Sequence, residues 1–168
     1  MTRTAAREIA IQLGFSVANT GVEPQAAVEE FFEPEHYATM AAEGELYGEK
    51  PSKKDLDFIG RSVTGVAEHR EELDELIGKY AKGWRTERIS RSAAAILRQA
   101  IYEILYMPDV PDAASMDEAV ELAKGYEDAD VVAFINGVLG GFYRAEVSGE
   151  DKPAAAPVSE PQEEPTDE

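Results

Sequence analysis

Few side chains in this sequence are placed for catalysis or metal binding. The two histidines, His36 and His69, have no second strong ligand at the spacing of a metal site, so both are interpreted as solvated. The acidic run from Glu71 to Glu75 is typical of a solvated helix face, where Glu75 and Lys79 make a weak surface pair. Cysteine is absent, which excludes disulfides, thiol catalysis and cysteine-ligated zinc. We therefore predict a protein that is not an enzyme, with no catalytic site, metal or cofactor.

Two arginines and a phenylalanine near the amino terminus form the first candidate binding site. Arg3 and Arg7 lie four residues apart, so on a helix both project from one side, and Phe15 points away from the apolar stripe. An exposed ring beside arginines is a recurrent device for single-stranded RNA, where each stacked base contributes about 1–3 kcal/mol. The alternative is that Phe15 packs beneath another helix and the arginines are ordinary surface residues.

A strip on the last predicted helix forms the second candidate site. At 100° per residue, Asp130, Phe134, Gly137 and Gly141 fall close together beside the apolar stripe. Glycine inside a helix costs about 1 kcal/mol relative to alanine. Two glycines beside an aromatic residue therefore indicate close approach by a ligand or, as the alternative, by another helix.

A basic segment from 79 to 98 is the third candidate, with six bases and one acid in an otherwise acidic chain. It contains a possible basic stripe: Lys82, Arg85, Arg88 and Arg91. Such a stripe suits phosphates or an acidic protein, or it neutralises the chain's own acids. Arg98 is set apart, because its place near the central apolar stripe suggests a structural ion pair with Glu121 or Glu103.

The charge is unevenly distributed along the 168 residues, whose formal net charge is −18. Residues 146–168 hold eight acids, one lysine and four prolines, a composition that predicts a disordered acidic tail. Residues 1–145 carry 15 bases against 26 acids, which weighs against autonomous nucleic-acid binding. No run of apolar residues is long enough to span a membrane, and no export signal is apparent, so we expect a cytoplasmic protein.

The elements that must position these candidates are all helical. Apolar residues recur at helical spacing throughout, beginning with Ala6, Ile9, Ala10, Leu13 and Val17, and no useful segment alternates with a period of two. Seven helices are expected: the first over this stripe, 25–33, one capped by Ser52, one carrying Leu73 to Trp84, 90–107, 116–125 and 129–144. Residues 34–52 are expected to be a long loop. A capping box of Ser115 and Glu118 is expected to open the sixth helix.

Several motifs in order give the sequence a family likeness. They are Ile96-Leu97-Arg98 followed by Tyr102-Glu103, then Val110-Pro111, Glu118 to Lys124, and Phe134 to Leu139. In residue types and spacing this series resembles the NusB family of bacterial transcription antitermination factors. Arg7-Glu8, Ala10 and Gln12 echo the family's first helix. The resemblance implies an all-α bundle over 1–145 in two packed subdomains, about 1–53 and 54–145.

The resemblance also implies a function. A NusB-like factor would pair with the ribosomal protein NusE, bind the single-stranded boxA element of nascent ribosomal RNA, and act in the RNA polymerase antitermination complex. It would place RNA contacts on the first helix and on the positions of Asp130 and Phe134. Thr4, Ala5 and Ala6 stand where the family tends to be basic, Val131 and Ala133 replace a serine and a lysine, and Ala93 replaces an acid near the partner interface. The alternative is a NusB-fold regulatory or structural protein deficient in RNA binding, either a homodimer or an adaptor that sequesters the ribosomal protein.

Overall fold

A computed structural model of the protein describes residues 1–44, 50–83 and 89–149, and this part of the chain contains helices and no strand. The helices are α1 (Arg3–Thr20), α2 (Pro24–Phe31), α3 (Pro34–Ala41), α4 (Lys53–Glu68), α5 (Arg70–Tyr80), α6 (Arg91–Tyr106), α7 (Asp112–Tyr126) and α8 (Ala129–Phe142). A π-helical turn, Tyr143–Ser148, follows α8. The predicted all-α class is confirmed, with eight α-helices in the described residues where seven were expected.

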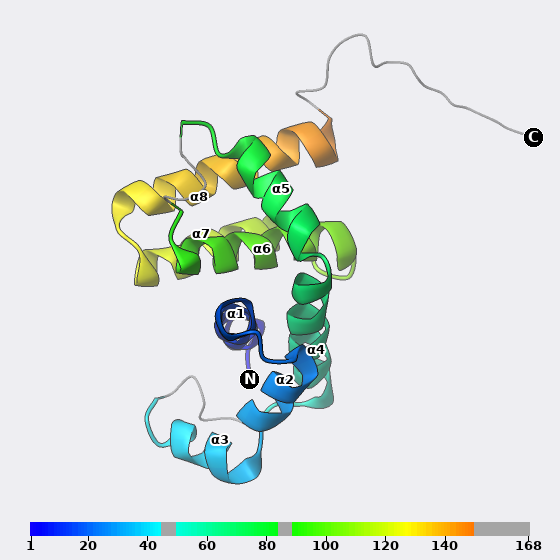
Figure 1. The fold of residues 1–168 in the computed structure, drawn as a ribbon, viewed down its shortest axis with the longest axis vertical. Coiled ribbons are helices and arrows are strands. Elements are labelled where there is room, and N and C mark those ends of the chain that lie inside the picture. Colours follow the sequence, from blue (N-terminus) through cyan, green and yellow to red (C-terminus); the bar gives the residue numbers. More distant parts are fainter. Residues whose placement is uncertain (45–49, 84–88, 150–168) are drawn as a thin grey trace, which may run out of the picture.

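The first helix lies in the middle of the molecule. Figure 1 shows α1 end-on, with α2, α3 and α4 below and beside it and the α6–α7 pair above it. Thr2 caps the start of the helix, where its hydroxyl oxygen accepts the N–H of Ala5, and Gly21 caps its end with a φ of 77° that suits glycine. Its predicted apolar stripe is buried against α2 and α4. The first hydrophobic core comprises Ala6, Ile9, Ala10, Leu13, Ala27, Phe31, Tyr37, Phe58, Ile59, Val63, Met107 and Val110.

The expectation of a loop over 34–52 is wrong for its first part, because residues 34–41 form α3. Glu33 caps this helix by accepting the N–H groups of Glu35 and His36, and Pro34 occupies a first-turn position where its missing N–H costs nothing. Tyr37 is buried against Phe31, with ring centroids 6.0 Å apart. Pro34 therefore starts a helix here, although the prolines, glycines and acids of 34–52 indicate a loop.

The second core lies between α5, α6, α7 and α8. The predicted cap at Ser52 is confirmed: Ser52 Oγ accepts the N–H of Asp55, and Asp55 Oδ2 accepts the N–H of Ser52 at 2.8 Å. From this start α4 packs against α1, and α5 and α6 follow it in the chain. α6 contacts α1, α4, α5, α7 and α8. The core includes Leu73, Ile77, Ile96, Leu97, Ala100, Ile101, Ala119, Ala123, Ile135, Val138, Leu139 and Phe142.

The predicted capping box of Ser115 and Glu118 is wrong. α7 begins four residues earlier than expected, at Asp112 after Pro111, and Ser115 is fully buried inside it. The Ser115 hydroxyl donates to Glu103 Oε1 at 2.7 Å instead of capping a helix. The Ser-x-x-Glu pattern is also compatible with a helix interior whose serine contacts a neighbouring helix, and here that tertiary bond prevails.

A buried polar junction joins the two cores. Arg7 on α1 donates through Nε and Nη2 to both carboxylate oxygens of Glu103 on α6, each at 2.8 Å. Gln99 donates to Glu103 Oε2 and to the Ser62 hydroxyl on α4, each at 2.9 Å. With Ser115, these residues are 0–2 % exposed. A buried charge is tolerated when it is paired and hydrogen-bonded, and Glu103 meets both conditions.

Other predictions differ in detail. Arg98 pairs with Asp74 on α5, from Nε to Oδ1 at 2.7 Å, and not with Glu121 or Glu103. The π-helical turn carries helical chain on to Ser148, three residues into the segment assigned to the acidic tail, and residues 150–168 lie outside the described part. α4 supplies Phe58 to the first core and Val66 to the second, so the division at about residue 54 stays a prediction.

Two features are absent from the described residues. None of their helices is both long and apolar enough to cross a bilayer. Nor do their histidine, aspartate and glutamate side chains gather in a group able to hold a metal ion.

Candidate RNA interface

A hollow of about 500 Å³ opens where α8 passes the end of α5, and we call it the α8 hollow. The predicted strip on α8 lines it, as helical spacing requires. Its lining residues are Tyr80, Lys82, Asp130, Ala133, Phe134, Gly137, Val138, Gly141 and Arg144. Asp128 caps the helix by accepting the N–H of Val131 at 3.1 Å, which fixes where the strip begins.

The two glycines of the strip have different surroundings. A Cβ atom added at Gly141 would lie 3.4 Å from Tyr80 Cδ1, an ordinary contact with α5. An added Cβ at Gly137 would meet no atom within 4 Å. A methyl group would thus fit at Gly141 in contact with α5, while at Gly137 the missing side chain leaves the hollow open to a ligand.

Phe134 forms the apolar part of the hollow. Phe134 is only 7 % exposed and belongs to the second core, so only a small part of the residue is available to a ligand. This favours the packing alternative for most of the ring. Asp130 is exposed in the first turn of α8, where the helix dipole favours a carboxylate.

Charged groups surround the hollow unevenly. Lys82 and Arg144 line it as cations and Asp130 as an anion. Lys79, three residues before Lys82, pairs with Glu146 at 3.0 Å, and this hydrogen bond raises the pKa of the Lys79 ammonium group. Tyr80 also donates to Glu146; burial, reinforced by this bond, raises the pKa of its hydroxyl. The Glu146 contacts tie the π-helical turn, which also contains Arg144, to α5.

The two arginines of α1 occupy opposite environments. Arg3 is exposed, with its guanidinium 4.1 Å from the centroid of the Phe58 ring. Arg7 is 2 % exposed, engaged by Glu103, and 3.4 Å from Glu118 Oε1. The expectation that both arginines project from the surface is wrong for Arg7. Its donors are directed to carboxylates inside the protein, so it is a structural residue.

Phe15 lies in a different hollow from Phe134. Its ring is 37 % exposed and lines an apolar hollow of about 260 Å³ between α1, α6 and α7. The other lining residues are Ile11, Gln12, Ser92, Ala95, Ile96 and Tyr126. None of these is a cation, so the surroundings of Phe15 suit an apolar side chain better than a nucleotide.

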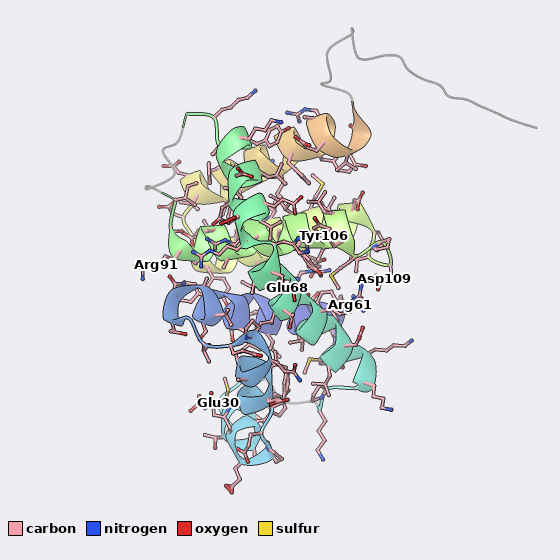
Figure 2. The ribbon with its side chains drawn as sticks, turned by 45° about the vertical axis from the view of Figure 1, so that its right-hand side comes forward. Glu30, Arg61, Glu68, Arg91, Tyr106 and Asp109 are labelled. Carbon is pink, nitrogen blue, oxygen red and sulfur yellow. The ribbon has the colours of Figure 1, made fainter. Side chains whose placement is uncertain are left out.

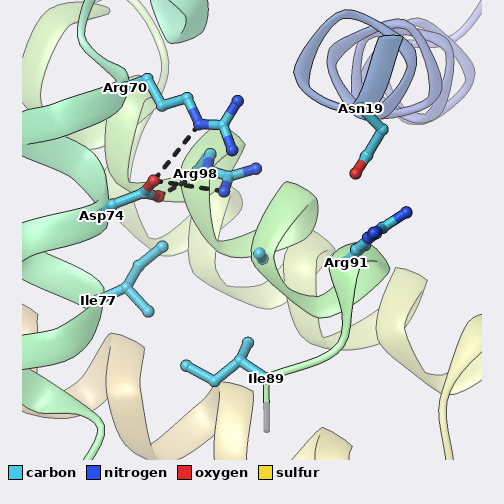
Figure 3. A pocket seen from close by; sticks show the side chains of 8 residues that line it. Asn19, Arg70, Asp74, Ile77, Ile89, Arg91 and Arg98 are labelled. Carbon is cyan, nitrogen blue, oxygen red and sulfur yellow. Dashed lines mark hydrogen bonds and ion pairs between the residues drawn. The ribbon is translucent and has the colours of Figure 1, made fainter. Parts of the chain in front are cut away.

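The described part of the predicted basic stripe is divided between two hollows. Lys82 lines the α8 hollow, and Arg91 lines a pocket of about 370 Å³ between α1, α5 and α6. In Figure 3, Arg70 and Arg98 both reach Asp74 from one side of this pocket, while Arg91 stands apart at the start of α6. No described residue forms an ion pair with Arg91. Arg85 and Arg88 lie outside the described residues.

The chain is similar to known proteins over nearly all of its helical part. The sequence pattern of the NusB family matches residues 4–144, from the second residue of α1 to the π-helical turn. The chain belongs to the NusB family. It is 41 % identical over 144 residues to the transcription antitermination protein NusB of Symbiobacterium thermophilum, covering 86 % of this chain and 90 % of that protein. It is 39 % identical over 140 residues to the NusB of Carboxydothermus hydrogenoformans, covering 83 % and 91 %.

Solved structures agree. A T. maritima NusB structure aligns with a TM-score of 0.69 at 25 % identity, over 86 % of this chain and 92 % of the other. A chain in a crystal structure described as a plectonemic RNA supercoil aligns with a TM-score of 0.67 at 25 % identity, over 87 % and 96 %. The protein is thus a NusB-family transcription antitermination factor.

Within this NusB fold, two polar residues of the α8 hollow, Arg144 and Tyr80, were missed by sequence reasoning. Arg144 lies three residues after Gly141, so the same helical spacing that found the strip would have placed it there. Tyr80 reaches the hollow from α5, and no local spacing relates it to α8. Only the packing of the two helices reveals its contribution.

Proposed function

We propose that this NusB-family factor pairs with the ribosomal protein NusE and binds the single-stranded boxA element of nascent ribosomal RNA, within the RNA polymerase antitermination complex. The α8 hollow is the proposed site for a base of the RNA. Its open space above Gly137, beside the exposed part of Phe134, is the observation that carries the proposal. A role on nascent RNA places the protein in the cytoplasm.

The hollow offers chemistry suited to one nucleotide. An unstacked base can contact the rim of Phe134 while Lys82 and Arg144 face the phosphates on either side. Asp130 can accept a hydrogen bond from a base edge, which supplies selectivity. Arg3 is exposed and is proposed as a further RNA contact, whereas Arg7 is not.

The charge of the chain explains why a partner is needed. With a formal net charge of −18, the protein repels a polyanion at long range, and only local cations oppose this. A basic ribosomal protein would supply the missing charge and be attracted to this acidic domain. The apolar hollow at Phe15 is the proposed contact for that protein partner, since apolar pockets anchor protein interfaces.

A binding assay with Phe134→Leu tests the RNA site. Leucine keeps apolar volume in the core but removes the ring, so we expect the NusE-bound protein to lose about 1–3 kcal/mol of boxA affinity. Phe32→Leu is the matched control, because Phe32 is a partly buried ring packed on the first core, away from α8. Affinity is measured by titrating labelled boxA RNA with and without NusE, alongside the melting temperature of each variant.

The same assay decides between the proposal and its alternative. If NusE brings no gain in RNA affinity, the protein is instead a NusB-fold regulator deficient in RNA binding. The enclosure of Arg7 by acids, which removes one expected cation from the surface, favours that alternative. A homodimer would then appear as a doubled mass in sedimentation and an adaptor as an RNA-free complex with NusE.

A further inference from the structure

Another hollow lined by cations lies where α1 and α4 both begin. We call its four cations the α4 basic patch: Arg3, Lys53, Lys54 and Arg61. Lys53 and Lys54 are the first two residues of α4, and Arg61 follows two turns later on the same helix. The remaining lining residues are Asp57, Phe58 and Asp109.

The patch carries more positive charge than its own acids neutralise. Arg61 lies between Asp57 at 3.4 Å and Asp109 at 3.3 Å, and Figure 2 shows Arg61 and Asp109 near each other. Among the described residues, Lys53 and Lys54 have no ion-pair partner. The nearby carboxylate of Asp55 is engaged by the Ser52 cap and by the amino group of Met1 at 3.3 Å. Four cations against two lining acids leave a local excess of positive charge in a strongly acidic protein.

Lys53 and Lys54 stand where a helix disfavours them. The first turn of a helix carries partial positive charge from its free N–H groups, so cations there add to charge of the same sign. Both lysines are exposed, so they add to the local positive potential without taking part in packing. An anion bound at this end of α4 would relieve that repulsion.

The geometry suits a phosphate more than a base. Phe58 is 1 % exposed and lies beneath the Arg3 guanidinium, so the hollow presents no ring on which a base can stack. Its exposed groups are guanidinium and ammonium donors spread over two helices. Such groups bind backbone phosphates and carry no sequence information.

We infer that the α4 basic patch binds the phosphodiester backbone of the RNA, independently of its sequence. This inference rests on the proposed function and deepens it. The proposed protein partner is itself cationic and is repelled by this patch, so in the complex the anion available to it is the RNA. On α1 only Arg3 is available for such contacts, since Arg7 is enclosed and Thr4, Ala5 and Ala6 carry no charge, and α4 supplies the others.

The test is a salt titration of RNA binding by the full chain with NusE. The double variant Lys53→Gln/Lys54→Gln is compared with Arg70→Gln/Lys124→Gln, which removes the same charge from two surface cations already in ion pairs. The slope of log affinity against log salt is negative, and for a single strand each lost phosphate contact reduces its magnitude by about 0.7. Between 50 and 200 mM salt, the ratio of wild-type to double-variant affinity should therefore fall about sevenfold for two contacts.

A second comparison separates backbone from base recognition. The Lys53→Gln/Lys54→Gln variant should weaken binding of boxA RNA and of a scrambled RNA of equal length by the same factor. Phe134→Leu should instead reduce the preference for boxA over the scrambled RNA. The control double variant should leave the salt slope unchanged.

Distinct outcomes overturn distinct claims. The α4 site alone is overturned if the wild-type complex binds boxA normally and the Lys53→Gln/Lys54→Gln variant shows the same salt slope as the wild type. Weakened binding of NusE by this variant in the absence of RNA also overturns it, because the patch would then be a protein contact. Failure of the wild-type complex to bind boxA overturns the proposed function and the α4 site together.

Discussion

The buried junction around Glu103 and the α8 hollow contain similar kinds of residue, but the junction encloses its charged groups and the hollow leaves them accessible. At the junction, Arg7 directs its guanidinium at Glu103, and no member of the network is more than 2 % exposed. At the hollow, Lys82 is exposed and Gly137 leaves open space beside Phe134. An arginine in the sequence therefore predicts a binding site only if the fold leaves its donors without an internal acceptor.

The two regions also use glycine differently. Gly65 on α4 faces Tyr102 on α6 so closely that an added methyl group would overlap the tyrosine hydroxyl and ring. Gly137 faces open space. One glycine lets two helices approach, and the other keeps a hollow empty, so substitutions at the two should have opposite effects on stability.

The largest effect is expected from breaking the junction with Arg7→Met. The variant keeps the apolar stem but leaves the Glu103 carboxylate buried without its cation, which typically costs about 3–5 kcal/mol. The free energy of unfolding, measured in urea at pH 7, should fall by that amount. Adding Glu103→Gln should restore part of the loss, because the buried charge is then removed as well.

The control for this prediction is Arg3→Met. Arg3 is exposed above the Phe58 ring, an arrangement that contributes about 0.5–1 kcal/mol. If Arg7→Met costs no more than Arg3→Met, the junction is not the closed structural element described above, and Arg7 returns as a candidate for RNA contact.

A smaller loss is expected from Gly65→Ala, which tests close approach at the junction side. The new methyl group would force the Tyr102 ring from its place against His69 and Tyr106, and overpacking of this kind costs about 1–3 kcal/mol. Gly60→Ala, on the same helix with no atom within 4 Å of the added carbon, should instead stabilise the protein by up to about 1 kcal/mol. Equal unfolding midpoints for the two variants would contradict the α4–α6 packing.

Asp55 combines features of the buried junction and of the exposed sites. It is nearly buried, yet it directly follows Lys53 and Lys54 of the α4 basic patch. Burial of the Asp55 carboxyl raises its pKa, but hydrogen bonds from Ser52 and from the amino group of Met1 outweigh this, so the pKa is lowered. The ionised carboxylate therefore stabilises the fold above its ordinary pKa, and this contribution is lost as the pH falls through the lower folded value.

Asp55→Asn should accordingly cost about 1 kcal/mol at pH 7, the usual value of a helix cap. The difference between wild type and variant should shrink as the pH falls from about 5 to 2. Urea unfolding of both proteins across this range measures it. A difference that does not change with pH would mean that the charge of Asp55 plays no part in the cap.

The sequence predicted most helices because their apolar spacing is strong, and it failed where tertiary contacts decide. The stripe of α1 and the Ser52 cap of α4 are confirmed. α3 was missed because the prolines, glycines and acids of 34–52 indicate a loop, although proline is accepted in a first turn. The start of α7 was misplaced because Ser115 bonds Glu103 across the junction, a partner that no local pattern reveals.

The candidate site was predictable in part for the same reason. Helical spacing alone placed Asp130, Phe134 and Gly137 on one strip, and these residues line one hollow. The fate of Arg7 was not predictable, because its partner Glu103 lies ninety-six residues away in the chain. Spacing reports which side of a helix a residue occupies, and only the packing of other helices determines whether that side is covered.

The smallest effect on stability, and the sharpest contrast with Gly65, is expected at Gly137. Gly137→Ala replaces a helix-interior glycine where there is room, so it should raise the free energy of unfolding by about 0.5–1 kcal/mol. The added methyl group would project into the α8 hollow, so boxA affinity of the NusE-bound protein should fall although the protein is more stable. Gly60→Ala is again the control, since it should give the stability gain without the loss of affinity. A gain in stability accompanied by unchanged RNA affinity would show that no base approaches Gly137, and the open space in the hollow would then need another explanation.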